Sequence, residues 1–187
     1  MTNTRLDKAF DIVDRSNFLP ENLKAYSKLD QPLSISHHQT NSQPSTVKLM
    51  LGWLGVQEGD KILDVGSGSG WTSALLANLT GKNGRVIAIE RIPDLMLFGK
   101  DNCEKLGIKN IEFVLADGKI GYEKEAPYDR ILVSAAAKDI PISLLGQLKI
   151  GGKLVIPIRN DILEITKRSD DKNDIVVHPG FIFVPLV

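Results

Sequence analysis

The 187-residue chain contains a single cysteine, Cys103, and no long hydrophobic run. One cysteine cannot form a disulfide within the chain, and it excludes a zinc site built from several thiolates. No stretch approaches the roughly 20 consecutive apolar residues that span a bilayer. The first residues also lack the apolar core of a signal peptide. We therefore expect a cytoplasmic protein without a membrane segment, in which Cys103 is a packing residue of a helix.

The sequence also lacks an excess of charge of either sign. Lysine and arginine together number 23, and so do aspartate and glutamate. No global positive field is therefore available to attract a phosphate backbone, and we expect no nucleic-acid partner. The length allows one ordinary hydrophobic core, which predicts a single domain. We expect this domain to be a monomer.

What the sequence does contain is an alternation of short apolar runs with segments of helical periodicity. The predicted strands are residues 61–65, 85–90, 111–117, 130–136 and 151–158. The predicted helices are residues 5–13, 20–28, 47–54, 71–80, 93–107 and 140–148. This order predicts a doubly wound, Rossmann-like α/β sheet that is mostly parallel and covered on both faces. Farther on, two apolar runs around a charged turn predict an antiparallel C-terminal hairpin, and the closing "FIFVPLV" predicts a last strand.

A glycine-rich loop, "GSGSG" at 66–70, follows the first strand of the alternation. In open α/β sheets a ligand binds beyond the carboxyl ends of the strands, and the loop after the first strand is the favoured place. Glycine permits positive φ and lets a ligand touch the backbone. We expect a ligand to contact Gly66, Ser67, Gly68, Ser69 and Gly70. Asp64, at the end of the preceding strand, is predicted to receive a ligand ammonium directly or through water.

Acidic residues also end the next two strands. Glu90 lies 20 residues beyond Gly70, where a carboxylate can accept both hydrogens of a ribose diol while repelling a 2′-phosphate. Arg91 follows it and is predicted to belong to the same site. Asp117 and Gly118 follow the third strand, either as an ordinary turn or as a contact to the exocyclic amine of adenine.

The spacing of the glycines favours one nucleoside cofactor over another. Nicotinamide dinucleotides use G-x-G-x-x-G, whereas residues 66–70 follow G-x-G-x-G. The chain after Asp117 also leaves little room for the second mononucleotide half that such a cofactor needs. S-adenosyl-L-methionine fits better, with its ammonium near Asp64, its ribose on Glu90 and its adenine beside Asp117. The constellation therefore predicts a methyltransferase.

From about residue 18 onward, ordered blocks of the chain resemble the protein-L-isoaspartate O-methyltransferase family. The blocks are "FLPENLKAYSKLDQPLSI", "QTNSQPSTVKLM", "LDVGSGSGW", "AIERIP", "DGKIGYEKEAPYDRILVSAAA", "QLKIGGKLVIPI" and "FVPLV". The resemblance implies a repair enzyme, which transfers a methyl group from S-adenosyl-L-methionine to the carboxylate of L-isoaspartyl residues in damaged proteins or peptides.

The polar strip "SHHQTNSQP" at 36–44 contains one of the most specific of these blocks. In the family, a loop of the form Q-T-I-S-x-P closes over the sulfonium and the substrate carboxylate, and its serine is the catalytic-site residue. The resemblance implies that Ser42 is catalytic and that Thr40, Asn41 and Ser42 contact the cofactor. From the residues alone, Ser42 could equally cap the helix that follows.

The adjacent histidines His37 and His38 do not form a convincing metal site. In an extended segment their rings point in different directions, which is poor geometry for a shared ion. We interpret them as solvated or loop-packing residues and predict no metal.

Departures from the family pattern leave other functions open. Asn41 stands where the family usually has isoleucine, and "RNDILEITK" follows "LVIPI" where the family usually carries a glycine-rich segment. The alternatives are a methyltransferase for a small metabolite or a nucleic-acid base, and a cofactor-binding relative without catalysis. We divide the predicted domain into N-terminal helices with a substrate lid (1–45), a cofactor-binding core (46–158) and C-terminal antiparallel strands (159–187).

Overall fold

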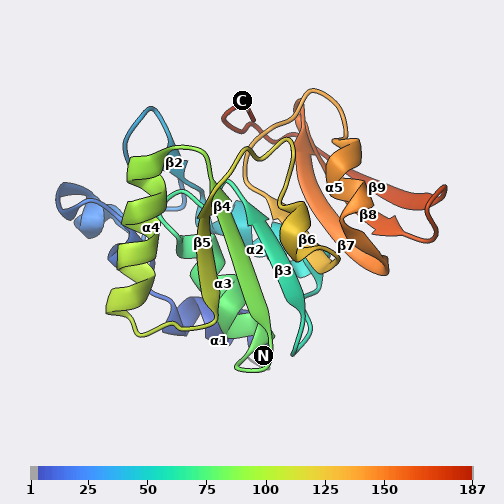
Figure 1. The fold of residues 1–187 in the computed structure, drawn as a ribbon. Coiled ribbons are helices and arrows are strands. Elements are labelled where there is room, and N and C mark those ends of the chain that lie inside the picture. Colours follow the sequence, from blue (N-terminus) through green and yellow to red (C-terminus); the bar gives the residue numbers. More distant parts are fainter. Residues whose placement is uncertain (1–3, 187) are drawn as a thin grey trace.

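The computed structural model describes residues 4–186 and contains a seven-stranded sheet with helices on both faces (Figure 1). The strand order is β5-β4-β3-β6-β7-β8-β9. The strands are β3 (Lys61–Val65), β4 (Arg85–Glu90), β5 (Ile111–Leu115), β6 (Tyr128–Val133), β7 (Leu148–Ile158), β8 (Asp161–Lys167) and β9 (Asn173–Pro179). Each predicted strand from 61–65 to 151–158 is thereby confirmed, with small shifts at its ends.

The pairing of the strands also confirms the predicted fold class. β3, β4, β5, β6 and β7 pair in parallel, whereas β7 with β8 and β8 with β9 pair antiparallel. The sheet winds outward from β3 through β4 to β5, then crosses to β6 on the other side of β3. The strand order therefore reverses at β3, and ligands of such sheets bind at the carboxyl ends of the strands at this reversal.

Both faces of β3 are buried, because its side chains alternate between two hydrophobic clusters. Ile62 packs into the cluster built around α2 and α3, while Leu63 and Val65 pack into the cluster that includes Leu144 of α5. In Figure 1, α2 and α3 accordingly lie behind the sheet and α5 lies in front of it. The α-helices are α1 (Arg5–Ile12), α2 (Pro44–Leu54), α3 (Trp71–Thr80), α4 (Pro93–Lys105) and α5 (Ile142–Gly146).

Helices α2 and α4 have residues at their ends that favour the start or the end of a helix. Pro44 and Pro93 occupy the first turns of α2 and α4, where a missing N–H leaves no bond unmade. Gly55 ends α2 with a φ of 62°, which is the left-handed conformation typical of a helix C-terminus.

The prediction of a helix at residues 20–28 is only partly correct. The structure has short 3₁₀ turns in this region, η1 (Arg15–Phe18) and η2 (Glu21–Tyr26). None of the η2 residues is buried, so no tertiary packing supports a longer α-helix there. A two-residue antiparallel pair, β1 (Leu33–Ser34) with β2 (Thr40–Asn41), follows it and was not predicted.

The prediction of a last strand at "FIFVPLV" is wrong for residues 181–186, which form only an isolated bridge between Pro185 and Ala136; residue 187 lies outside the described residues. Gly180 and Phe181 both donate their backbone N–H to the carbonyl of Asn160, which turns the chain back from β9. The tail then crosses to the carboxyl edge of the sheet, where Leu186 donates to the carbonyl of Ala136. Its apolar alternation comes from packing against the core rather than from pairing along a strand. No helix in the described part of the chain has the length and apolar character needed to cross a bilayer.

Candidate functional site

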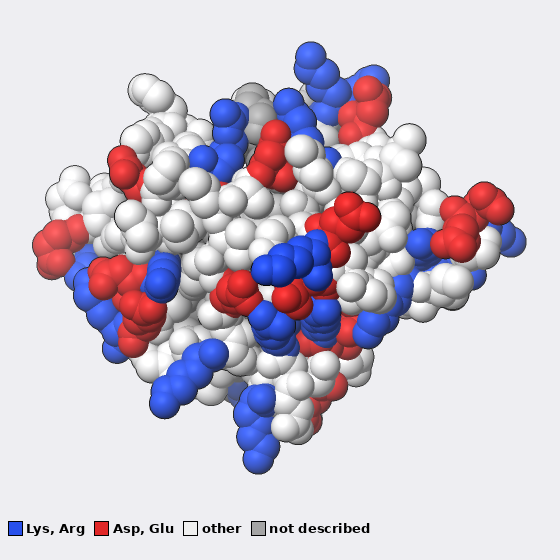
Figure 2. Space-filling view, in the orientation of Figure 1, with Lys and Arg blue, Asp and Glu red and all other residues white. Residues whose placement is uncertain are grey.

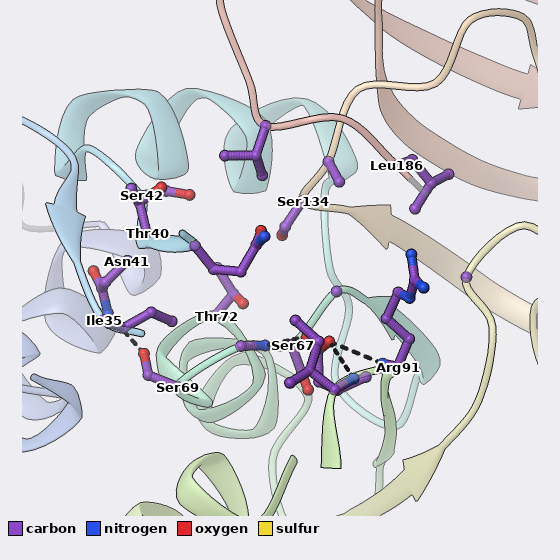
Figure 3. A pocket seen from close by; sticks show the side chains of 18 of the residues that line it. Ile35, Thr40, Asn41, Ser42, Ser67, Ser69, Thr72, Arg91, Ser134 and Leu186 are labelled. Atoms are coloured by element: carbon purple, nitrogen blue, oxygen red, sulfur yellow. Dashed lines mark hydrogen bonds between the residues drawn. The ribbon is translucent and has the colours of Figure 1, made fainter. Parts of the chain in front are cut away.

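A cavity lies at the carboxyl edge of the sheet, where the strand order reverses at β3 (Figure 3). Six separate stretches of chain form most of its wall, and they are residues 39–42, 66–69, 89–92, 116 with 118, 134–135 and 184–186. In Figure 3, Thr40 and Ser42 lie on one side of this space and Arg91 lies on the other. The cavity therefore brings together the polar strip, the glycine loop and the end of β4, as the sequence predicts.

The glycine loop can approach a ligand because its glycines adopt conformations that other residues rarely adopt. Gly66 and Gly68 have φ values of 78° and 51° and lie in the cavity wall. Gly70 has a different task, because it does not line the cavity. A Cβ on Gly70 would lie 2.8 Å from the carbonyl oxygen of Gly99, so this glycine allows α4 to pack closely against the start of α3.

Glu90 lies in the cavity wall and is held by backbone amides. Its Oε1 accepts from the N–H groups of Arg91 (2.8 Å) and Ile92 (3.0 Å), and its Oε2 accepts from the N–H of Gly68 (3.1 Å). A carboxylate has about four acceptor positions, two on each oxygen, so Oε2 can accept a further hydrogen bond. The end of β4 thus presents an oriented carboxylate with an acceptor position left for a ribose hydroxyl.

Asp64 lies beneath the glycine loop instead of in the cavity wall. Its Oδ2 accepts hydrogen bonds from Ser73 Oγ (2.6 Å) and Thr72 Oγ1 (3.1 Å), and Thr72 itself lines the cavity. The side chain is fully buried, and burial raises the pKa of Asp64 to about 6. Its Oδ1 has no partner among the described residues. Asp64 therefore keeps an unused acceptor, and the Thr72 side chain connects this residue to the cavity.

Asp117 and Gly118 differ in their relation to the cavity. Asp117 is exposed, and its Oδ1 accepts from the backbone N–H of Lys119 at 2.9 Å, which is a local turn contact. Gly118 lines the cavity, and a Cβ there would lie 2.7 Å from Val65 Cγ1. Ala116 and Gly118, rather than Asp117, form this part of the wall.

The structure tests one of the two interpretations of Ser42, that of a helix cap. The N-cap of α2 is Gln43, and the free N–H of Ser45 is satisfied by Asp30 Oδ1 at 2.9 Å. Ser42 therefore does not cap the helix, and the capping interpretation is wrong. Its side chain lines the cavity instead.

Asn41 lines the cavity as well, but protein groups take both ends of its side chain. Its Oδ1 accepts from Arg15 Nε at 2.7 Å, and its Nδ2 donates to Ser69 Oγ at 3.0 Å. The polar residue that replaces the usual isoleucine therefore adds no free amide to the cavity.

Several residues of the wall were not predicted. Ser134 follows β6, which neighbours β3, so the position of its strand could have indicated it. Gln39 belongs to the Q-T-x-S-x-P block, whose serine alone drew attention. Residues 184–186 reach the cavity only because the tail turns back from β9, and no local pattern reveals that path. Ile35, Trp71, Thr72, Ile89, Ile92, Ala116 and Ala135 complete the set of unpredicted wall residues.

The histidine and cysteine residues lie outside this cavity. His37 and His38 are exposed, and His37 Nε2 lies 3.1 Å from Asp94 Oδ2. Cys103 is buried in the core cluster, which confirms it as a packing residue, and burial raises the pKa of its thiol to about 12. No group of three or more His, Cys, Asp or Glu side chains within residues 4–186 could hold a metal ion.

Sequence comparisons connect this site with known proteins. The model of the protein-L-isoaspartate(D-aspartate) O-methyltransferase (PCMT) family matches residues 1–187. The chain is 42% identical to the protein-L-isoaspartate O-methyltransferase of Methanothrix thermoacetophila, over 98% of this chain and 88% of that protein. It is also 42% identical to the protein of the same name from Pyrococcus horikoshii, over 98% and 84% of the two chains.

Solved structures give the same result. A protein-L-isoaspartate O-methyltransferase structure superposes with a TM-score of 0.89 and 29% identity, over 97% of this chain and 60% of that one. The enzyme of that name from Plasmodium falciparum, in complex with S-adenosyl-L-homocysteine, superposes with a TM-score of 0.88 and 29% identity, over 100% and 92% of the two chains.

Proposed function

Because this chain belongs to the protein-L-isoaspartate(D-aspartate) O-methyltransferase family, we propose that it methylates L-isoaspartyl carboxylates in damaged proteins or peptides. The methyl donor is S-adenosyl-L-methionine. The observation that carries this proposal is the match of the family model to residues 1–187. The backbone amide nitrogen then attacks the methyl ester spontaneously and expels methanol, which gives a succinimide. Hydrolysis of the succinimide returns some normal aspartate, so the reaction repairs the damaged chain.

The buried polar atoms of the site fit this cofactor. Asp64 Oδ1 and Ser67 Oγ are buried without partners among the described residues, and such groups are stabilised by a ligand that supplies hydrogen bonds. The cofactor carries an ammonium that can donate toward Asp64, through Thr72 or water, and a ribose hydroxyl that can donate to Glu90. We assign the cofactor-binding role to the predicted residues of the wall, with Asp64 beneath it.

When bound, the cofactor supplies a methyl group on a sulfonium that carries its own leaving group. The chain itself has little chemistry left to perform. An aspartyl-type carboxylate has an unperturbed pKa near 4, so the acceptor is ionised at neutral pH and needs no base. Holding the reacting groups in line can lower the barrier by up to about 7–11 kcal/mol. Positioning and the exclusion of water are therefore the main contributions of the protein.

We assign the positioning of the acceptor to the polar lid. Ser42 donates a hydrogen bond to the acceptor carboxylate or orients it, and its hydroxyl is not used in capping α2. A polar lid holds a carboxylate without protonating it, whereas an apolar lid would raise its pKa and weaken its nucleophilicity. We therefore keep Ser42 as the catalytic residue.

Two structural observations argue against the alternative of a cofactor-binding relative without catalysis. The usual glycine-rich segment is replaced by a short turn at residues 159–160 between β7 and β8, yet residues 184–186 form the wall at this side of the cavity. Asn41, the second departure from the family, points no unpaired amide into the cavity. Neither departure leaves the site open, which supports a working transferase.

We further propose that the protein acts in the cytoplasm as a monomer of one domain, with no nucleic-acid partner. The equal numbers of basic and acidic residues and the single cysteine support this proposal. Lysines, arginines and acids also alternate over the face drawn in Figure 2, without a field of one sign.

Incubation with labelled S-adenosyl-L-methionine tests the function. One peptide contains an L-isoaspartyl residue, and its matched twin contains a normal aspartyl residue at the same position. We expect label to enter the isoaspartyl peptide and not its twin. Equal labelling of both peptides, or labelling of neither, would defeat the assignment.

A further inference from the structure

Arg15 in η1 is a buried cation without a carboxylate partner. The residue is 5% exposed. No ion pair joins it to a carboxylate anywhere in residues 4–186, and Asp30 acts on it only by longer-range attraction. Burying a charge in this way is costly unless its hydrogen-bonding groups are fully used. Its hydrogen bonds should therefore indicate why the chain keeps a cation at this position.

The guanidinium connects two segments through their carbonyl oxygens. On one side, Nη1 donates to Leu29 at 3.0 Å and Nη2 donates to Gln31 at 2.9 Å. On the other side, Nη2 donates to the carbonyls of Asn41 (3.1 Å) and Ser42 (3.0 Å). Arg15 thus binds the backbone carbonyls of Asn41 and Ser42, and Ser42 is the residue assigned to catalysis.

The side chain of Asn41 extends this connection to the glycine loop. A guanidinium can only donate, so the amide oxygen of Asn41 must face Arg15 Nε and its NH₂ group must face Ser69. The measured distances are 2.7 Å to Arg15 and 3.0 Å to Ser69 Oγ. Figure 3 shows Asn41 and Ser69 meeting at the edge of the cavity. A continuous path of hydrogen bonds therefore runs from the buried cation through the lid to the glycine loop.

We propose that Arg15 is a positioning residue for methyl transfer, which holds the lid turn at residues 40–42 against the glycine loop through Asn41. This inference rests on the proposed function, because it requires Ser42 to act on the acceptor. With the turn fixed at both the backbone and the Asn41 side chain, the Ser42 hydroxyl is set toward the cavity before any ligand arrives. Arg15 itself is absent from the cavity wall, so we assign it an effect on the reaction through the turn alone.

The substitution Arg15→Lys tests this role, since it keeps the charge but loses the planar fork of five donors. We expect kcat for the isoaspartyl peptide to fall about 10- to 100-fold, in the range of a misplaced catalytic group. The Kd of S-adenosylhomocysteine and the KM of the peptide should change less. Unchanged kcat in the folded variant would overturn the proposal.

Arg130→Lys is the matched control. Arg130 is also a largely buried arginine, 15% exposed in its side chain. It donates to the carbonyls of Gly55 and Asp129, outside the lid. Unlike Arg15, it pairs with a carboxylate, that of Asp60 at 3.5 Å. We expect this variant to lose thermal stability and to keep its kcat. A similar loss of kcat in both variants would show a general effect of disturbing a buried arginine, and would overturn the proposal.

A second variant, Asn41→Leu, breaks the path between Arg15 and the glycine loop while keeping a side chain of similar size. We expect its kcat to fall, and we expect the double variant with Arg15→Lys to lose no more than Arg15→Lys alone, because both act through one path. Losses that multiply would contradict the path. If Arg15→Lys does not fold, an unchanged kcat in Asn41→Leu overturns the proposal by itself.

Hydrogen exchange provides a readout that does not depend on activity. Without ligand, the amides of residues 40–42 should exchange faster in Arg15→Lys than in the parent and in Arg130→Lys. Equal exchange in all three would contradict the positioning role, even if the parent methylates its peptide. Faster exchange with an inactive parent would instead refute the proposed function and leave the positioning of the turn supported.

Discussion

At the scale of single residues, Ser42 is the position on which the chemistry depends most. Sequence reasoning could not choose between a helix cap and a catalytic group, because both uses place a serine just before a helix. The structure assigns the capping contact at Ser45 to Asp30. That assignment leaves the Ser42 hydroxyl for the cavity, and it makes the role of Ser42 testable without loss of the helix.

We expect the Ser42→Ala variant to bind S-adenosylhomocysteine nearly as tightly as the parent but to turn over slowly. A hydrogen bond to a charged group contributes about 1.5–3 kcal/mol, so kcat should fall about 10- to 100-fold. Steady-state kinetics with the isoaspartyl peptide measure this loss, and thermal unfolding should show that α2 is intact. Turnover equal to that of the parent would remove Ser42 from the mechanism.

Asp64 gives a second residue-level prediction, on stability and pH. Burial raises the pKa of Asp64 from 3.8 to about 6, so the folded state binds this proton more tightly than the unfolded state does. The contribution of Asp64 to stability is therefore fully present below about pH 4 and is lost as the pH rises through about 6. A shift of this size corresponds to roughly 2–3 kcal/mol.

The Asp64→Asn variant should lack this loss. We expect the free energy of unfolding of the variant to increase relative to that of the parent between pH 4 and pH 7, so that the variant becomes relatively more stable. Denaturant unfolding of both proteins without ligand at several pH values measures the difference. Parallel pH profiles would show that Asp64 ionises at its ordinary pKa in the folded chain.

At the scale of elements, the glycine loop and the helix beside it form one packed unit. Gly70 combines a φ of 86° with a close approach to Gly99, and a Cβ on Gly99 would in turn lie 2.7 Å from the carbonyl oxygen of Gly68. The last glycine of the loop therefore serves the packing of α3 on α4, while Gly66 and Gly68 serve the cavity. Sequence spacing alone does not separate these two uses.

Gly70→Ala should consequently destabilise the fold. Left-handed backbone and overpacking each cost about 1–3 kcal/mol, so we expect a loss of at least about 2 kcal/mol in denaturant unfolding. Gly146→Ala in α5 is the control, because no atom lies within 4 Å of its added Cβ and alanine favours a helix. A Gly70→Ala protein as stable as the parent would contradict the packing role.

The elements that sequence predicted well are those whose burial produces a clear pattern. The central residues of β3 and β4, at 62–63 and 86–89, are apolar because both faces of these strands are covered. The tail after β9 misled the prediction because Phe181 and Phe183 alternate with exposed Ile182 as they would in a strand. These two phenylalanines pack against the hydrophobic core instead of pairing with a strand. Their position depends on the turn at Asn160, which local sequence propensity does not predict.

At the scale of the whole molecule, the sheet topology explains why residues distant in sequence meet at one cavity. The predicted residues Glu90 and Gly66 meet because parallel strands around β3 end at the same edge. Arg15 and Leu186 approach this edge from the two ends of the chain, so strand periodicity contains no signal for them. The site could thus be predicted where the sheet builds it and where the Q-T-x-S-x-P block matches the family, but not at Arg15 or in the tail.

The central claim is that the cavity at β3 seats S-adenosyl-L-methionine with its methyl group toward the lid turn at residues 40–42. A crystal structure with S-adenosyl-L-homocysteine tests it most directly. We predict a ribose hydroxyl on Glu90 and the sulfur facing the turn that carries Ser42. A ligand bound elsewhere, or a lid turn swung away from the sulfur, would contradict the account.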